Sequence, residues 1–145
     1  MEGRDLVLGG VKIPHSQGLS GHSDADVLVH AIGEAILGAL SLGDLGKHFP
    51  DTDPKYKGIS SLKILSSICD MVIKENARIV NIDSSIVAAE PKLSGHIIKM
   101  RENIAGVLKI PVDQISVKAT TTEGMGFAGR KEGISAYAVV LIEKD

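Results

Sequence analysis

The sequence predicts an α/β (α+β) fold, with a mixed β-sheet whose helices pack on one face and whose other face packs against further copies of the chain. Three observations support this class. Apolar residues alternate along the chain between the spacing of strands and that of helices. The last strand, residues 134–143, is apolar on both faces, which is typical of a strand covered on both sides. Three helices suffice to cover one face of the sheet only, so the other face is expected to pack against a second copy of the chain in a homo-oligomer. In the alternative, one helix crosses to that second face.

The first third of the chain indicates a short strand and a turn, followed by a helix. A short strand at 6–8 meets a Gly9-Gly10 turn, and an apolar segment and a polar loop follow. Ser23 is the expected N-cap of the first helix, which runs to about Leu42.

The remaining elements alternate in type. Each is bounded by Gly, Pro or Asp residues, which favour turns and end helices. In chain order we expect an Asp-, Gly- and Pro-rich loop at 44–58, a helix at 60–76, a strand at 79–90, a helix at 95–109, a strand at 115–122, a glycine-rich loop at 123–133 and the closing strand at 134–143.

Composition restricts the function classes. The 145 residues suit one domain, and two Tyr, two Phe and no Trp leave few rings on which bases stack. A formal net charge of −2 gives no basic surface for nucleic acid. The lone Cys69 excludes an internal disulfide and favours a reducing compartment. No apolar run approaches the ~20 residues of a membrane span and no secretory signal is present, so we expect a cytoplasmic protein, or a plastid one in a plastid-bearing eukaryote.

Several polar residues are candidates for a metal site. Asp26, His30 and Glu34 share one helix face, so they are spaced to reach one ion or each other. In the alternative, Asp26 caps the helix and orients a neutral His30. The acidic loop that contains Asp44, His48, Asp51 and Asp53 has a similar alternative in ordinary turn chemistry.

A second candidate site lies at the end of a strand. The run TTTEG, residues 120–124, places three hydroxyls and a carboxylate where α/β sheets tend to bind ligands. The sequence has no phosphate-binding Gly-Lys-Ser/Thr loop, no Gly-x-Ser-x-Gly elbow and no Cys-x-x-Cys pair. This favours a metal-assisted reaction on a substrate that brings its own nucleophile. A metal-dependent phosphatase is a competing interpretation, with its metal ligands drawn from Asp26, His30, Asp44 and His48.

Four ordered blocks give a more specific indication. They are GHSDADVLVHAIGEAILGAL, GDLGKHFPDTDPKYKG, AEPKL and VKATTTEGMGFAGRKEGI. In this order and at these separations the chain closely resembles the 2-C-methyl-D-erythritol 2,4-cyclodiphosphate synthase family of the non-mevalonate isoprenoid pathway. The resemblance implies a homotrimer with active sites between subunits. It implies a lyase that converts 4-diphosphocytidyl-2-C-methyl-D-erythritol 2-phosphate into the cyclic diphosphate and CMP. A non-catalytic trimeric core that binds cytidine nucleotides or isoprenoid diphosphates is the alternative.

The resemblance also assigns roles to residues. It implies that His22 and Thr121 are catalytic, that His30 is a zinc ligand, and that Glu123 binds magnesium or manganese. The family's other two zinc ligands come from an Asp-x-His strand, and this sequence starts after that strand, so we expect 1–145 to be a synthase domain without it. The implied substrate-binding residues are His22 and Ser23 in a closing loop; Asp44, Leu45 and Gly46 at the methylerythritol hydroxyls; Phe49, Pro50, Asp51, Thr52 and Asp53 beside them; Ala88, Ala89, Glu90, Pro91, Lys92, Leu93 and Ser94 at the cytosine; Thr120, Thr121, Thr122 and Glu123 at the phosphates; and Phe127 and Arg130 near the trimer axis and the phosphates.

Overall fold

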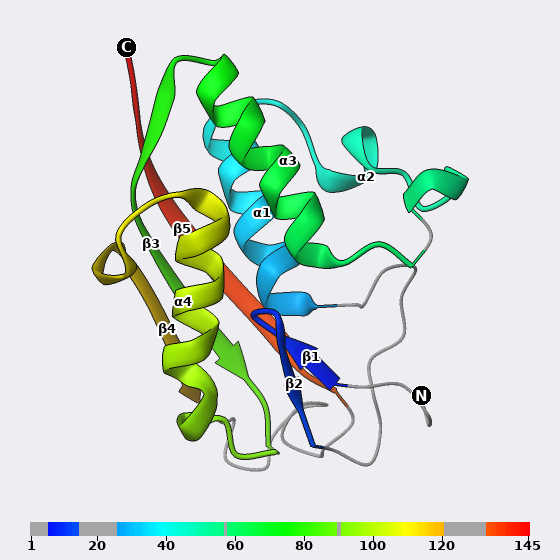
Figure 1. The fold of residues 1–145 in the computed structure, drawn as a ribbon, viewed down its shortest axis with the longest axis vertical. Helices are drawn as coiled ribbons and strands as arrows, with labels where there is room; N and C mark the ends of the chain where they lie inside the picture. The colour runs from blue at the N-terminus through cyan, green and yellow to red at the C-terminus, as the bar shows by residue number, and fades with distance from the viewer. Residues whose placement is uncertain (1–5, 15–25, 57, 90, 121–132) are drawn as a thin grey trace.

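A three-stranded mixed sheet organises the chain, and the computed structural model describes residues 6–14, 26–56, 58–89, 91–120 and 133–145 (Figure 1). The strands are β3 (Ala77–Val87), β4 (Ile115–Thr120) and β5 (Ser135–Lys144). The central strand β3 pairs in parallel with β4 and antiparallel with β5, so the predicted mixed sheet is confirmed. Ile82 of β3 lies opposite Ile115 and Val140, which brings three apolar side chains onto one face.

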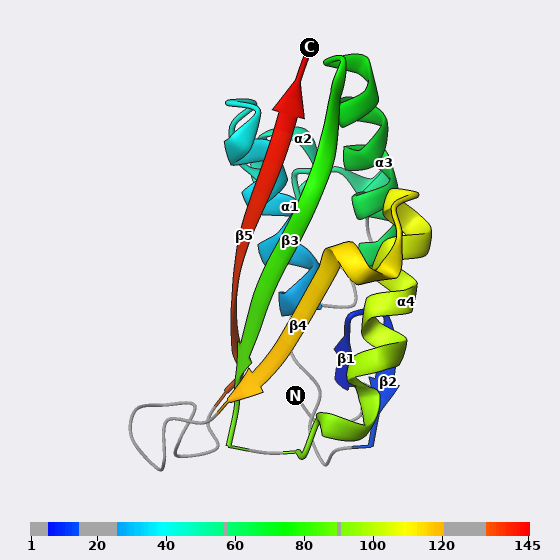
Figure 2. The same cartoon turned by 90° about the vertical axis from the view of Figure 1, so that its left-hand side faces the viewer.

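Helices cover that face and leave the other open (Figure 2). They are α1 (Val27–Ala39), α3 (Ser61–Lys74) and α4 (Ile97–Leu108). The alternative in which a helix crosses to the second face is therefore wrong for the described residues. On the open face Tyr137, Val139 and Leu141 are 65%, 72% and 58% exposed, whereas Ile82 and Ile86 are buried beneath the helices. The last strand, β5, is apolar on both faces, and one of these faces is therefore uncovered in the isolated chain.

A two-stranded hairpin packs beside the helices as a separate small sheet. It pairs β1 (Leu6–Leu8), the strand predicted before the Gly9-Gly10 turn, with β2 (Val11–Ile13), a strand that was not predicted. Gly9 and Gly10 both have positive φ, +56° and +75°, which is the backbone conformation that tight hairpin turns require. A side chain at Gly9 would also lie 2.6 Å from Cβ of Met100 on α4. The turn is therefore docked directly on a helix.

The first helix differs from its predicted limits. It begins at Val27 with Asp26 as its N-cap, so the prediction that Ser23 caps it is wrong; Ser23 lies outside the described residues. It ends at Ala39, before the predicted Leu42, with Leu40 as its C-cap.

Four short helices complete the described structure. They are α2 (Leu45–His48), η1 (Pro54–Tyr56), η2 (Ser94–His96) and η3 (Val112–Gln114). The first two lie within the predicted loop 44–58, and α2 carries candidate site residues; η2 overlaps the start of the helix predicted at 95–109. Among the described residues, no helix has the length and apolar character needed to cross a membrane.

Candidate functional site

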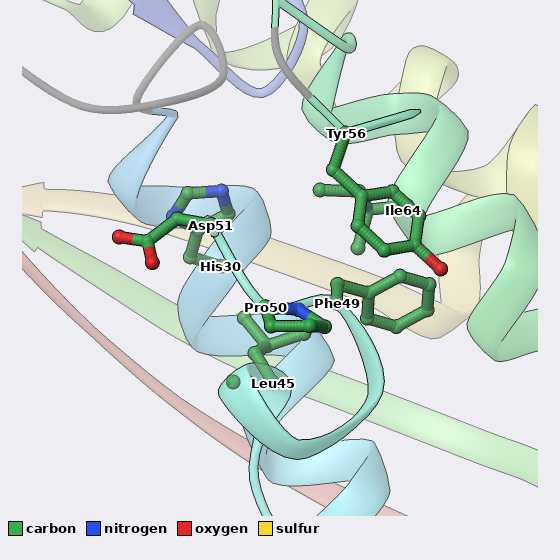
Figure 3. A pocket seen from close by; sticks show the side chains of 8 residues that line it. His30, Leu45, Phe49, Pro50, Asp51, Tyr56 and Ile64 are labelled. Carbon is green, nitrogen blue, oxygen red and sulfur yellow. The ribbon is translucent and has the colours of Figure 1, made fainter. Parts of the chain in front are cut away.

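One pocket lies between α1, α2 and α3 and has a volume of about 360 Å³ (Figure 3). We call it the α2 pocket. Its lining residues are His30, Leu45, Gly46, Phe49, Pro50, Asp51, Tyr56 and Ile64. Six of these belong to the residue set that the resemblance implies; Tyr56 and Ile64 do not. Figure 3 shows the His30 ring and the Asp51 carboxylate together at one side of the pocket, with Phe49, Tyr56 and Ile64 at the other.

The apolar side of this pocket is built from two rings. Phe49 and Tyr56 meet edge to face with centroids 5.5 Å apart, and Lys55 Nζ lies 4.9 Å from the centre of the Tyr56 ring. Hydrogen bonding with the Tyr56 side chain, followed by the charges of Tyr56 and Asp53, raises the pKa of Lys55. The sequence held a usable indication of Tyr56, because two of the chain's four Phe and Tyr residues fall within eight positions, in the block that contains the implied site.

The imidazole of His30 is held from the side of α3. Its Nε2 lies 3.0 Å from Oγ of Ser61, the first residue of α3, and Ser61 is fully buried. A buried hydroxyl that is bonded to a ring fixes the ring's orientation. His30 is itself half-buried, so its ring is constrained while still lining the pocket.

Asp26 has a structural role at the start of α1. Its Oδ1 accepts hydrogen bonds from the backbone N–H groups of Gly9 and Val29, both at 3.0 Å, and its Oδ2 accepts one from Gly10 at 2.7 Å. The prediction that Asp26 caps the helix is therefore confirmed. Because three donors contact its two oxygens, this buried carboxylate is a poor candidate for a metal ligand in the described structure.

The acidic loop is also organised by local hydrogen bonds. Asp44 caps α2 by accepting from Lys47 N at 2.9 Å, and Asp53 accepts from Lys55 N at 3.1 Å. Nε2 of His48 lies 2.7 Å from the carbonyl oxygen of Leu42. Asp44 and Asp53 thus form the cap and turn hydrogen bonds that the turn-chemistry interpretation expects.

The described residues do not bring the proposed phosphatase ligands together. Within the described ranges, no group of three or more His, Cys, Asp or Glu residues is placed to hold a metal ion. Instead, Asp26, Asp44 and His48 form hydrogen bonds with three different parts of the backbone, at Gly9, Lys47 and Leu42 respectively. Of the implied metal ligands, His30 is described and Glu123 lies outside the described residues.

A second pocket opens where β3 and β4 end, with a volume of about 660 Å³. We call it the strand-end pocket. Its lining residues are Ala88, Ala89, Pro91, Lys92, Leu93, Ser94, Ala119 and Thr120. Ala88 N donates to Thr120 O at 3.1 Å, which joins the two strand ends, and the buried Leu93 anchors the turn that follows β3. All residues from 88 to 94 except Glu90, which is not described, therefore share one pocket with Thr120.

The two pockets share no lining residue. In Figure 1, α1 and α3 lie between α2, beside the first pocket, and β4, whose end marks the second. Asp44, Thr52 and Asp53 are described but are not among the residues that line either pocket. The other implied site residues fall outside the described residues: His22, Ser23, Glu90, Thr121, Thr122, Glu123, Phe127 and Arg130.

Comparison with known proteins identifies the family. The model of the YgbB family matches residues 1–143. The chain belongs to the YgbB family. Among curated relatives, the 2-C-methyl-D-erythritol 2,4-cyclodiphosphate synthase of Syntrophomonas wolfei subsp. wolfei is 62% identical over 143 residues, which cover 99% of this chain and 91% of the relative. The family resemblance predicted from the four sequence blocks is thus confirmed.

Solved structures of this family match the fold as well. The bifunctional IspDF from Campylobacter jejuni has a TM-score of 0.95 and 43% identity, and the match covers 100% of this chain and 39% of that longer one. The Plasmodium falciparum IspF in a CDP complex has a TM-score of 0.84 and 37% identity, covering 100% of this chain and 88% of that one. The two pockets therefore belong to a YgbB fold that is shared with named synthases.

Proposed function

We infer that this chain is a cyclodiphosphate synthase that converts 4-diphosphocytidyl-2-C-methyl-D-erythritol 2-phosphate into 2-C-methyl-D-erythritol 2,4-cyclodiphosphate and CMP. The observation that carries the inference is the sorting of implied site residues into two pockets, one lined by residues from 45–51 with His30 and one by residues from 88–94 with Thr120. Membership of the YgbB family and a synthase relative of 62% identity support the same activity.

The strand-end pocket is proposed to bind the cytidine end of the substrate. Its described lining consists of short side chains, one proline, one leucine and one lysine, with no aromatic ring. Backbone N–H and C=O groups are therefore the main polar atoms available to select a base. A related structure, the Plasmodium falciparum IspF, is a CDP complex, which supports this assignment.

The α2 pocket is proposed to bind the methylerythritol and phosphate end. Asp51 lines the pocket and would accept hydrogen bonds from the hydroxyls, while the Phe49–Tyr56 pair supplies an apolar wall for the carbon skeleton. Asp44, the N-cap of α2, and the adjoining Thr52 and Asp53 are proposed as further substrate contacts from beside the pocket. The reaction joins two phosphates of one molecule, so the main task of these residues is to hold the folded substrate, and good positioning contributes roughly 7–11 kcal/mol in such intramolecular reactions.

We propose that a homotrimer brings the two pockets together, with the α2 pocket of one copy facing the strand-end pocket of the next. The open sheet face, with Tyr137, Val139 and Leu141 exposed, is the proposed contact surface. Beside it, Lys118 Nζ lies 2.9 Å from the Asp83 carboxylate, and this hydrogen bond holds the pKa of Asp83 below its ordinary value. Asp83 lies opposite Val139, so an ion pair flanks the apolar strand.

The described residues alone do not fit a catalytic zinc, because such an ion takes three protein ligands and the described part of the chain offers no such group. We propose His30 as one ligand of a divalent ion, with further ligands outside the described residues, and Glu123 as a ligand of magnesium or manganese. Bound divalent ions supply positive charge that offsets repulsion between phosphates. His22 and Thr121 are proposed to donate hydrogen bonds to the phosphates. Further phosphate contacts are proposed for Ser23, Thr120, Thr122 and Arg130, with Phe127 near the trimer axis and the phosphates.

The decisive experiment is a product assay on the purified chain with the diphosphocytidyl substrate and divalent ions. Stoichiometric release of CMP and the cyclic diphosphate is expected. Release of inorganic phosphate would instead favour the phosphatase interpretation. CDP binding without turnover would favour a non-catalytic core and overturn the proposed activity.

A further inference from the structure

A carboxylate on α1 is bonded to the backbone of α2, across the rim of the α2 pocket. Oε1 of Glu34 accepts a hydrogen bond from Leu45 N at 2.8 Å. Leu45 is the first residue of α2, and both Leu45 and Gly46 line the pocket. Glu34 itself is exposed and does not line it, so its contact with the pocket is indirect.

The four-residue helix α2 depends on partners outside itself. A helix this short makes few internal hydrogen bonds and is unstable alone. Asp44 accepts a hydrogen bond from the amide of Lys47, and Glu34 accepts one from the amide of Leu45. Two carboxylates therefore bind N–H groups of the first turn that have no partner within the helix. Only Glu34 comes from another element. Its hydrogen bond therefore fixes where α2 sits relative to α1.

The same helix carries His30 one turn before Glu34, which places both side chains on one face of α1. Next to Glu34, α1 packs closely against both α2 and α3. A Cβ at Gly33 would lie 3.5 Å from Cδ2 of Leu45 and 2.9 Å from Cδ1 of Ile68 on α3. Because His30 and Glu34 lie one turn apart on the same helix, the Glu34–Leu45 hydrogen bond helps to hold the 44–46 segment at its distance from the His30 ring.

We propose that Glu34 is a positioning residue for substrate binding, which acts by holding the pocket-lining start of α2 in register with His30. The inference rests on the proposed function, because it concerns the pocket assigned there to the methylerythritol end. Glu34 acts through the Leu45 amide, as a hydrogen-bond acceptor. The role requires an oxygen at this position and does not require a negative charge.

The test compares Glu34→Ala, which removes the acceptor, with Glu34→Gln, which keeps an Oε1 for the Leu45 amide. Glu102→Ala is the matched control, since Glu102 is an exposed glutamate on α4, remote from α2. For each full chain, CMP release gives kcat and KM, and amide hydrogen exchange of Leu45 by NMR reports the bond directly. Glu34→Ala should raise KM about fivefold with little change in kcat, and should speed Leu45 exchange by a similar factor. Glu34→Gln should stay within about twofold of the unmodified chain in both measurements.

The outcomes separate the two proposals. An active unmodified chain whose KM and Leu45 exchange are unaltered by Glu34→Ala would overturn the positioning role alone. Glu34→Gln as impaired as Glu34→Ala would also overturn it, because charge and not the acceptor would then matter. An unmodified chain that releases no CMP would overturn the proposed function, and the positioning role would fall with it.

Discussion

The carboxylate of Asp26 accepts a hydrogen bond from Gly10 N at 2.7 Å, which ties the β1–β2 turn to the start of α1. The same carboxylate accepts from Gly9 N and Val29 N. On the far side of the turn, Asn103 Nδ2 of α4 donates to Gly9 O at 3.0 Å. Hydrogen bonds therefore hold the hairpin between the start of α1 and α4. One consequence is that α1, which carries His30, has its position set by a distant turn.

Asp26→Ala is expected to lower the free energy of unfolding by about 3 kcal/mol, since it leaves three backbone N–H donors without their acceptor in a largely buried place. Urea denaturation followed by circular dichroism measures this. Asp70→Ala, at an exposed aspartate of α3, is the control and should stay within about 0.5 kcal/mol. If both changes lowered the free energy of unfolding equally, the Asp26 hydrogen bonds would not be what holds the hairpin to α1.

Gly9→Ala is expected to destabilise the chain by about 2 kcal/mol, because φ is +56° there and the new Cβ meets Met100 at 2.6 Å. Gly38→Ala, within α1, meets nothing within 4 Å and should stabilise by about 0.5 kcal/mol. Thermal melting of the two variants gives the comparison. A Gly9→Ala chain that melts no earlier than the unmodified chain would refute the docked turn.

The buried thiol of Cys69 is expected to make the free energy of unfolding fall as pH rises. A carboxylate whose pKa is lowered by folding has the opposite effect. Burial raises the pKa of its thiol above the ordinary 9.0, with Asp70 adding to the rise and Lys109 opposing it. Above about pH 9 the unfolded chain loses this proton before the folded one, so the free energy of unfolding should fall as pH rises further. Urea titrations between pH 8 and 10 test this, and Cys69→Ala should flatten the fall. An equally steep fall in that variant would assign the effect to other groups.

Val139→Asp is expected to break the proposed trimer without unfolding the chain, because the side chain is 72% exposed in the single copy. Analytical ultracentrifugation should find a monomer, and CMP release should be lost because the two pockets would no longer meet. Ile98→Asp changes a comparably exposed aliphatic residue, 69%, on α4 and should leave the mass unaltered. A Val139→Asp chain of unchanged mass would place the contact surface elsewhere.

Glu123→Gln is expected to slow CMP release by about a hundredfold or more, with the assembly mass unchanged, because it removes a charged ligand of the proposed magnesium or manganese. Treatment of the unmodified chain with a chelator should have a comparable effect that added magnesium or manganese reverses. Turnover that persists at its original rate in both cases would exclude a catalytic divalent ion.

Two short contiguous blocks of the predicted site residues each fall on one pocket. The segments around 45–51 and 88–94 each line one pocket because a loop of few residues folds around its own turn. Tyr56 and Ile64 were missed for the opposite reason. They reach the α2 pocket from η1 and α3, and their place there depends on how α3 packs against α1, which periodicity does not encode.

The order and type of the main elements could be predicted from the sequence alone, since apolar spacing follows the geometry of strands and helices. Helix limits could also be predicted where the cap is local: Ser60 accepts from Leu62 N and starts α3 near its predicted position. The packing in three dimensions was needed to choose Asp26 over Ser23 as the N-cap of α1, and to show that Tyr137, Val139 and Leu141 lie on the uncovered face. The Asp26 carboxylate binds amides 16 and 17 positions away, and such long-range contacts depend on packing in three dimensions, which no local pattern specifies.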